Sequence, residues 1–185
     1  MTQGFYGVLL LLFLFAPPVR DFLESIMILH MHMQMPMIII AGFLIGDYLI
    51  KKFPNFFSKW NENGIPGAVL LVFVTLYWMI PKTMDDALIS YTWEVFKFIS
   101  LAFLVGVPLR DSWKRLSDRV KDIVIIIFVF SFILMGALYI FSEQQLCNNY
   151  LQVEQLTLGW GFITMGICGI IYLIQEWFID SSKYE

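Results

Sequence analysis

The stretch HMHMQMPMIIIAGFLIGDYLI, residues 30–50, holds two histidines and four methionines in its first eight residues and is apolar almost throughout. A helix needs about 20 mostly apolar residues to cross the hydrocarbon core of a bilayer, and this stretch has that length. Histidines are rare inside membrane segments, where ionisable side chains are commonly functional. The stretch therefore predicts a membrane-spanning helix that carries a functional site.

The first eight residues of this stretch have the chemistry of a copper site. Thioether and imidazole groups are ligands that Cu(I) favours, and Met27 adds a thioether one turn earlier. We predict a copper site whose candidate ligands in this helix are Met27, His30, Met31, His32, Met33 and Met35. The alternative is that the methionines only fill space, because Met is a common packing residue of apolar helices.

The spacing of the two histidines constrains such a site. Residues three or four apart share one face of a regular helix, so His30 and His32 point in nearly opposite directions. Pro36 distorts the helix, because it donates no backbone hydrogen bond and its ring clashes with the carbonyl of His32. We expect both imidazoles to reach one ion only if this distortion changes the turn.

Composition places the whole chain in the membrane class. Of its 185 residues 59% are hydrophobic and 15% are charged, and the mean hydropathy of +0.74 is far too high for a soluble domain. We predict an all-α bundle of about six transmembrane helices in one integral membrane domain, which contacts the lipid bilayer and binds no nucleic acid. The expected spans are residues 4–18, 24–50, 64–80, 91–109, 123–141 and 156–178. Close helix packing is expected at Gly159, Gly161, Gly166 and Gly169.

The first apolar run, Gly4 to Ala16, is only roughly 20 Å long as a helix, which is short for a span. A secretory signal is the alternative, but no basic residue precedes the run and no small-residue cleavage pattern follows it. We expect a retained first span that ends at Pro17 and Pro18.

The basic residues predict the orientation of the chain. With six spans, nine Lys and Arg residues lie on the side of the two termini, whereas only Arg20 and Lys82 lie in the opposite loops. Because cytoplasmic loops carry an excess of Lys and Arg, we predict a multi-pass protein of the cell membrane with both termini in the cytoplasm.

This orientation gathers further candidate ligands on the outer side, next to the His-Met stretch. We include Asp85, Asp86 and Glu94 among the possible metal ligands. For the two aspartates the alternative is a helix cap or first-turn charge, and for Glu94 it is an ion pair with Lys97 three residues later. The cysteines predict no disulfide: Cys147 in an outer loop is a possible soft ligand, and Cys168 inside the last span is packing.

A resemblance appears in the order of these features. The His-Met helix runs into Ile38–Gly42, and the segment Trp78–Leu88 follows as WMIPKTMDDAL. Then Glu94 leads into a helix with Leu104-Val105-Gly106, and Glu154-Gln155-Leu156 precedes a helix with Gly159, Met165, Gly169 and Tyr172. From about Met27 to Phe178 this order resembles the CtaG family of haem-copper oxidase assembly factors and its short archaeal relatives.

The resemblance implies a helical membrane protein that helps to deliver or retain copper for a terminal oxidase. His30 or His32 would match the family's histidines on that helix, Asp85 or Asp86 its aspartate, and Glu94 the acidic start of the next helix. The chain departs from the family at Val95, where the family tends to have a histidine, and in having six expected spans where family members usually have about seven.

Three classes of function stay open. The first is an assembly factor that handles copper for a copper-dependent respiratory enzyme. The second is an accessory subunit of a membrane oxidase or copper-dependent monooxygenase, and the third is a small transporter in which Glu94 and Lys97 line a path. Catalysis by the chain alone is not predicted, because it has no phosphate-binding loop, no zinc-protease histidine pair and no Ser-His-Asp set.

Overall fold

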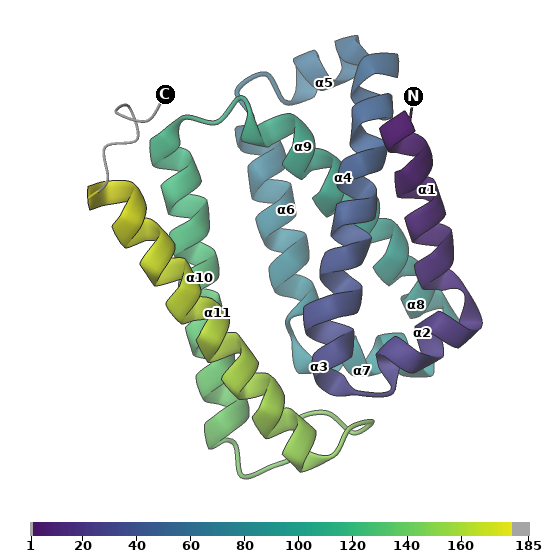
Figure 1. The fold of residues 1–185 in the computed structure, drawn as a ribbon, viewed down its shortest axis with the longest axis vertical. Coiled ribbons are helices and arrows are strands. Elements are labelled where there is room, and N and C mark those ends of the chain that lie inside the picture. The colour runs from purple at the N-terminus through teal and green to yellow at the C-terminus, as the bar shows by residue number, and fades with distance from the viewer. Residues whose placement is uncertain (1, 179–185) are drawn as a thin grey trace.

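The computed structural model describes residues 2–178, and in this range every regular element is helical (Figure 1). The elements, with two π-helical turns labelled η, are α1 (Thr2–Phe15), α2 (Pro17–Glu24), α3 (Met27–Leu29), η1 (His30–Gln34), α4 (Met35–Lys52), α5 (Pro54–Trp60), α6 (Ile65–Trp78), α7 (Pro81–Ile89), α8 (Tyr91–Ile99), η2 (Ser100–Gly106), α9 (Val107–Trp113), α10 (Asp118–Phe141) and α11 (Gln152–Phe178). The prediction of an all-α helical bundle is confirmed.

Four continuous helices are long and apolar enough to cross a bilayer: Met27–Lys52, Tyr91–Trp113, Asp118–Phe141 and Gln152–Phe178. Two further crossings arise if the bent pairs α1–α2 and α6–α7, with bends of 68° and 73°, each count as one span. The exposed faces of α10 and α11 are apolar, with Phe130, Ile167 and Ile171 at least half exposed. The chain is therefore a multi-pass membrane protein whose surface suits contact with lipid.

Prolines produce both bends. Pro17 and Pro81 begin α2 and α7, and the residues before them, Ala16 and Ile80, are extended with ψ near 128° and 127°. A residue before proline avoids the helical conformation, so α1 and α6 end there and the chain turns before the next helix begins. The short helices α2 and α7 consequently lie across the end of the bundle (Figure 1).

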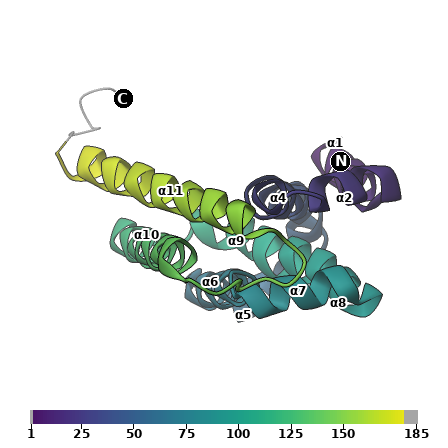
Figure 2. The same ribbon diagram turned by 90° about the horizontal axis from the view of Figure 1, so that it is seen from below.

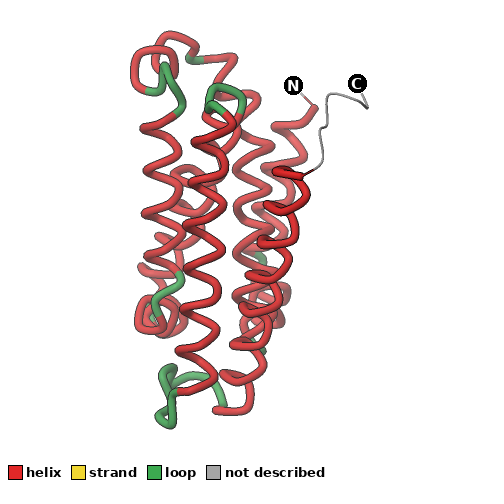
Figure 3. The backbone as a smooth tube through the Cα atoms, turned by 90° about the vertical axis from the view of Figure 1, so that its left-hand side faces the viewer, coloured by secondary structure: helices red, strands yellow, loops and turns green. Residues whose placement is uncertain are grey.

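Seen along the bundle, α11, α4 and α1 form one row and α10, α6 and α8 form another (Figure 2). Most helices run along the long axis of the molecule, with the connections gathered at its two ends (Figure 3). The start of α1, the end of α11 and α5 lie at one end, which we call the α5 end (Figure 1). The helix α7 and the loop of residues 142–151 lie at the other, which we call the α7 end (Figure 1).

Glycines allow the close contacts of this bundle. A Cβ added to Gly159, Gly166 or Gly169 would lie 2.8, 2.8 or 2.4 Å from side-chain atoms of α10, so the predicted close packing in the last span is found there. At Gly161 the nearest atom would be Nε2 of His32, at 3.2 Å. This glycine therefore makes room for an imidazole between helices.

Candidate functional site

The π-helical turn η1 carries both histidines and directs its side chains to two sides. In this turn the N–H of Met35 bonds to the carbonyl of His30, five residues back, directly before Pro36, the second residue of α4. A π-turn adds a residue to the turn and so shifts the faces before and after it. His30 and Gln34 point toward α2 and α8, while His32 faces α11, so the two histidines face apart as predicted.

The first side of η1 faces a polar cluster around Lys97 of α8, whose side chain has no exposed surface. Its Nζ lies 2.6 Å from Oε1 of Glu24, 3.1 Å from Nε2 of His30 and 3.1 Å from Oε1 of Gln34. We call Glu24, His30, Gln34, Lys97 and Tyr150 the lysine cluster.

Hydrogen bonds in the lysine cluster determine the tautomer of His30. The hydroxyl of Tyr150 donates to the backbone carbonyl of Glu24 at 2.8 Å, so its oxygen accepts from Nδ1–H of His30 at 2.9 Å. The other nitrogen, Nε2, then carries the lone pair and accepts from the ammonium of Lys97. His30 is thus a neutral imidazole with both nitrogens engaged, which leaves it no position for a metal ion.

Glu94 and Lys97 do not form the ion pair with each other that their spacing predicts. Instead Nε of Arg20 lies 3.1 Å from Oε1 of Glu94, and Lys97 binds Glu24. The reason is the charge pattern of α2, whose Arg20 and Glu24 lie four residues apart and face the opposite charges of α8. The prediction of an internal pair in α8 is therefore wrong, although both residues are paired.

The second side of η1 faces a cavity of about 140 Å³ among η1, α4, α6, η2, α10 and α11. Its lining residues, which define what we call the His32 cavity, are Met31, His32, Met35, Pro36, Ile39, Thr75, Trp78, Met79, Leu101, Phe132, Phe162 and Met165. Four thioethers and one imidazole therefore line a single cavity. The hydroxyl of Thr75 already donates to the carbonyl of Leu71, at 2.7 Å.

His32 is the unusual residue of this cavity. Both of its ring nitrogens are buried, and among residues 2–178 no side chain forms a hydrogen bond to either; the backbone of Gly161 lies beside the ring. Its ring packs 4.8 Å from that of Phe162, centroid to centroid, in the space that Gly161 leaves open. A buried polar atom without a partner costs about 1–3 kcal/mol, so the position calls for an explanation.

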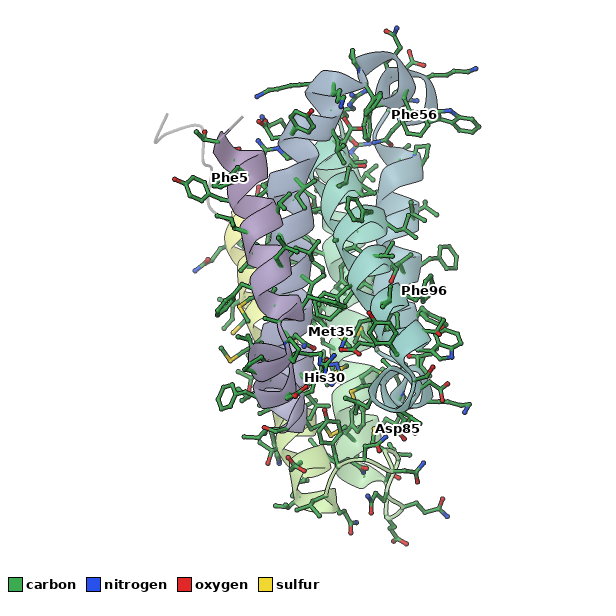
Figure 4. All side chains as sticks on the ribbon, turned by 90° about the vertical axis from the view of Figure 1, so that its right-hand side faces the viewer. Phe5, His30, Met35, Phe56, Asp85 and Phe96 are labelled. Carbon is green, nitrogen blue, oxygen red and sulfur yellow. The ribbon has the colours of Figure 1, made fainter. Side chains whose placement is uncertain are left out.

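The remaining candidate ligands lie elsewhere. Met27 is fully buried in the core and Met33 is 47% exposed, and neither lines the His32 cavity. Figure 4 shows His30 and Met35 inside the bundle, with Asp85 nearer its α7 end. Of the nine predicted ligands, the structure gathers only Met31, His32 and Met35 around one cavity.

Asp85 holds the loop of residues 142–151 in place. Its carboxylate accepts from the backbone N–H of Asn148 at 2.7 Å and from the side-chain amide of Asn149 at 3.1 Å. Asp86 pairs with Lys82 at 3.5 Å. Both aspartates lie within α7, and Ser90 occupies the N-cap position of the next helix, so the predicted role as caps of that helix is wrong.

Cys147 is buried beside this loop contact, with its Sγ 3.9 Å from the carbonyl of Pro81. Burial, together with the charge of Asp85, raises the pKa of the Cys147 thiol to about 12. The side chain is therefore a neutral thiol near neutral pH, which is a poor state for a metal ligand. Within residues 2–178 no three His, Cys, Asp or Glu side chains converge as a metal site of that type.

Sequence reasoning did not select Met79 or Met165 as ligands and did not identify Glu24 as the partner of Lys97. Helical spacing predicts which residues share a face of one helix. It does not predict which other helix packs against that face. The one available signal was the pair Arg20 and Glu24, whose spacing of four residues complements that of Glu94 and Lys97. The chain matches no known family model, no curated protein and no solved structure.

Proposed function

We propose that this membrane protein binds Cu(I) in the His32 cavity and handles it for a copper-dependent respiratory enzyme, as an assembly factor does. The observation that carries the proposal is the half-buried His32, whose buried ring nitrogens have no side-chain partner, in a cavity that four methionines also line. Imidazole nitrogen and thioether sulfur are donors suited to Cu(I).

The uncharged lining supports Cu(I) in particular. Thioethers and a neutral imidazole are soft donors, whereas Zn²⁺ sites draw on thiolates, imidazoles and carboxylates, and Mg²⁺ or Ca²⁺ sites on oxygen. A monovalent ion also has a smaller desolvation cost than a divalent one in an apolar space. We therefore expect the cavity to prefer Cu(I), or the chemically similar Ag(I), over divalent ions.

Water explains the unpartnered imidazole less well than a soft metal ion does. A buried water molecule needs two to four polar partners, and the lining side chains offer it the His32 ring and the oxygen of the Thr75 hydroxyl, whose proton is donated to Leu71. The other lining side chains are apolar or thioethers. A copper ion would use both the nitrogen and the sulfur atoms.

The role of handling copper, and not of catalysis with it, rests on two further points. The order of motifs resembles the CtaG assembly factors, and His32 lies near the α7 end, opposite the end with the basic residues. If that end faces the outside, the cavity lies on the side where respiratory copper centres receive their metal.

An accessory subunit of a membrane oxidase or monooxygenase is the second candidate. An apolar groove of about 620 Å³ lies on the outer face of α6 and α8, lined by Phe73, Val74, Tyr77, Trp78, Thr92, Trp93 and Phe96. Such a surface suits a transmembrane helix of a larger complex. A transporter has less support, because the buried residues of α4 between Gln34 and Asp47 are apolar or glycine and continue no polar path.

The test is Cu(I) affinity of the purified protein, measured under reducing conditions by competition with a chromophoric chelator. We expect one tight site in the wild type and its loss in His32→Ala, with weaker binding in Met79→Leu and Met165→Leu. Met33→Leu is the matched control, because this methionine belongs to the same stretch but is exposed, and we expect it to bind as the wild type does. Wild-type affinity in His32→Ala would contradict the proposal.

A further inference from the structure

The lysine cluster has the geometry of a cation site. Three acceptor atoms from two segments, Oε1 of Glu24, Nε2 of His30 and Oε1 of Gln34, lie 2.6–3.1 Å from a single point, which Nζ of Lys97 occupies. An ammonium group has three N–H donors, and these three acceptors satisfy all of them. The ammonium is therefore fully coordinated by the protein.

The three acceptors are also metal ligands in kind. A carboxylate oxygen, an imidazole nitrogen and an amide oxygen are donors that bind divalent ions of intermediate hardness such as Zn²⁺ and Co²⁺. Ligand distances of such ions are roughly 2.0–2.2 Å, so each donor would have to move inward by about 1 Å or less. Glu24 and Gln34 have flexible side chains that allow this movement.

The surroundings of His30 match those of a metal-binding histidine. Such a histidine usually donates its second ring N–H to a hydrogen-bond partner, which fixes the tautomer and aims the free nitrogen at the ion. Here Nδ1–H donates to Tyr150, which is itself held by the carbonyl of Glu24, and Nε2 faces the centre of the cluster. Gln34 is likewise held, since its Nε2 donates to Glu24.

We propose that Glu24, His30 and Gln34 form a second cation site, which the chain fills with its own Lys97 ammonium and which binds a divalent metal ion such as Co²⁺ or Zn²⁺ once that ammonium is removed. In the wild type the ammonium of Lys97 occupies the site and excludes the metal ion. It also fixes the shape of η1 when no metal is bound. This inference does not depend on copper binding in the His32 cavity, which lies on the other side of η1.

The experiment uses Co²⁺ as the probe, because its visible absorption becomes intense when nitrogen and oxygen ligands hold it in a site of low coordination number. Full-length Lys97→Ala protein, purified in detergent, is titrated with Co²⁺ beside the wild type and the double variant Lys97→Ala/His30→Ala. We expect saturable cobalt bands with one equivalent in Lys97→Ala, and their loss in the other two proteins. Absent bands in folded Lys97→Ala, or equal bands in the double variant, would overturn the proposal.

The melting temperature of Lys97→Ala, with and without Co²⁺, is a second test. Removing the ammonium leaves the partly buried carboxylate of Glu24 without its ion pair, and a bound Co²⁺ would replace the missing charge. We expect Co²⁺ to raise the melting temperature of Lys97→Ala and to leave that of Lys97→Ala/Glu24→Gln unchanged, with Mg²⁺ as the control ion. If Lys97→Ala is poorly folded and Co²⁺ does not restore it, the proposal fails.

Discussion

At the scale of single residues, the ion pair between Lys97 and Glu24 joins α8 to α2 where little water reaches it. The lysine has no exposed side-chain surface and the glutamate only 12%. Removing one partner of a buried pair costs about 3–5 kcal/mol, because the other charge stays behind without compensation, whereas replacing both partners costs less.

We therefore expect Lys97→Met to lower the free energy of unfolding by roughly that amount, about 3–5 kcal/mol, and Lys97→Met/Glu24→Gln to recover part of the loss. Reversible unfolding in mixed micelles measures both variants. Lys51→Met is the matched control, since this lysine pairs with Asp47 at 2.8 Å but is 71% exposed, so its loss should cost less than about 1 kcal/mol. If Lys97→Met/Glu24→Gln is no more stable than Lys97→Met, the unpaired charge of Glu24 is not the cause of the lost stability.

At the scale of the elements, the contact between α4 and η2 depends on glycine. A Cβ added to Gly42 would lie 1.9 Å from the backbone carbonyl oxygen of Ala102, and backbone atoms cannot move aside as a side chain can. At Gly46, one turn later on the same helix, the nearest atoms would be 3.4 Å away, which is ordinary contact.

We expect Gly42→Ala to destabilise the protein by roughly 1–3 kcal/mol or more, because α4 and η2 must separate to admit the methyl group. Gly46→Ala should be neutral or slightly stabilising, since alanine favours the helix over glycine. The melting temperatures of the two variants in detergent provide the comparison. Equal losses in both would mean that helix separation at Gly42 does not limit stability.

The elements also show how far the sequence predicts the structure. The apolar runs predicted the helices, because a bilayer demands long apolar segments and satisfied backbone groups. The opposite directions of His30 and His32 followed from helical spacing. The cavity beside His32 could not be predicted in this way, because Met79 and Met165 come from helices that are distant in sequence. It also depends on the π-turn before Pro36, and no spacing rule predicts where a π-turn forms.

At the scale of the whole molecule, the two ends of the bundle differ in charge. Lys51 near the end of α4, Lys114 between α9 and α10, and Lys121 near the start of α10 lie at the α5 end, whereas Lys82 belongs to α7 at the other end. The start of α1 and the end of α11 also lie at the α5 end (Figure 1). By the positive-inside rule, this arrangement predicts that the termini are cytoplasmic and that the α7 end lies outside.

Labelling of single cysteines in intact cells tests this orientation. In a Cys168→Ser background the only native thiol is Cys147, which is buried and whose pKa is raised to about 12, so it should not react with a maleimide near neutral pH. We expect a membrane-impermeant maleimide to label Lys82→Cys from outside, because this residue is 82% exposed at the α7 end. Lys114→Cys, at the basic end, should react only after the membrane is permeabilised. The reverse pattern would place the α7 end, and with it the nearer approach to the His32 cavity, in the cytoplasm, and a copper-handling role would then have to draw its metal from that side.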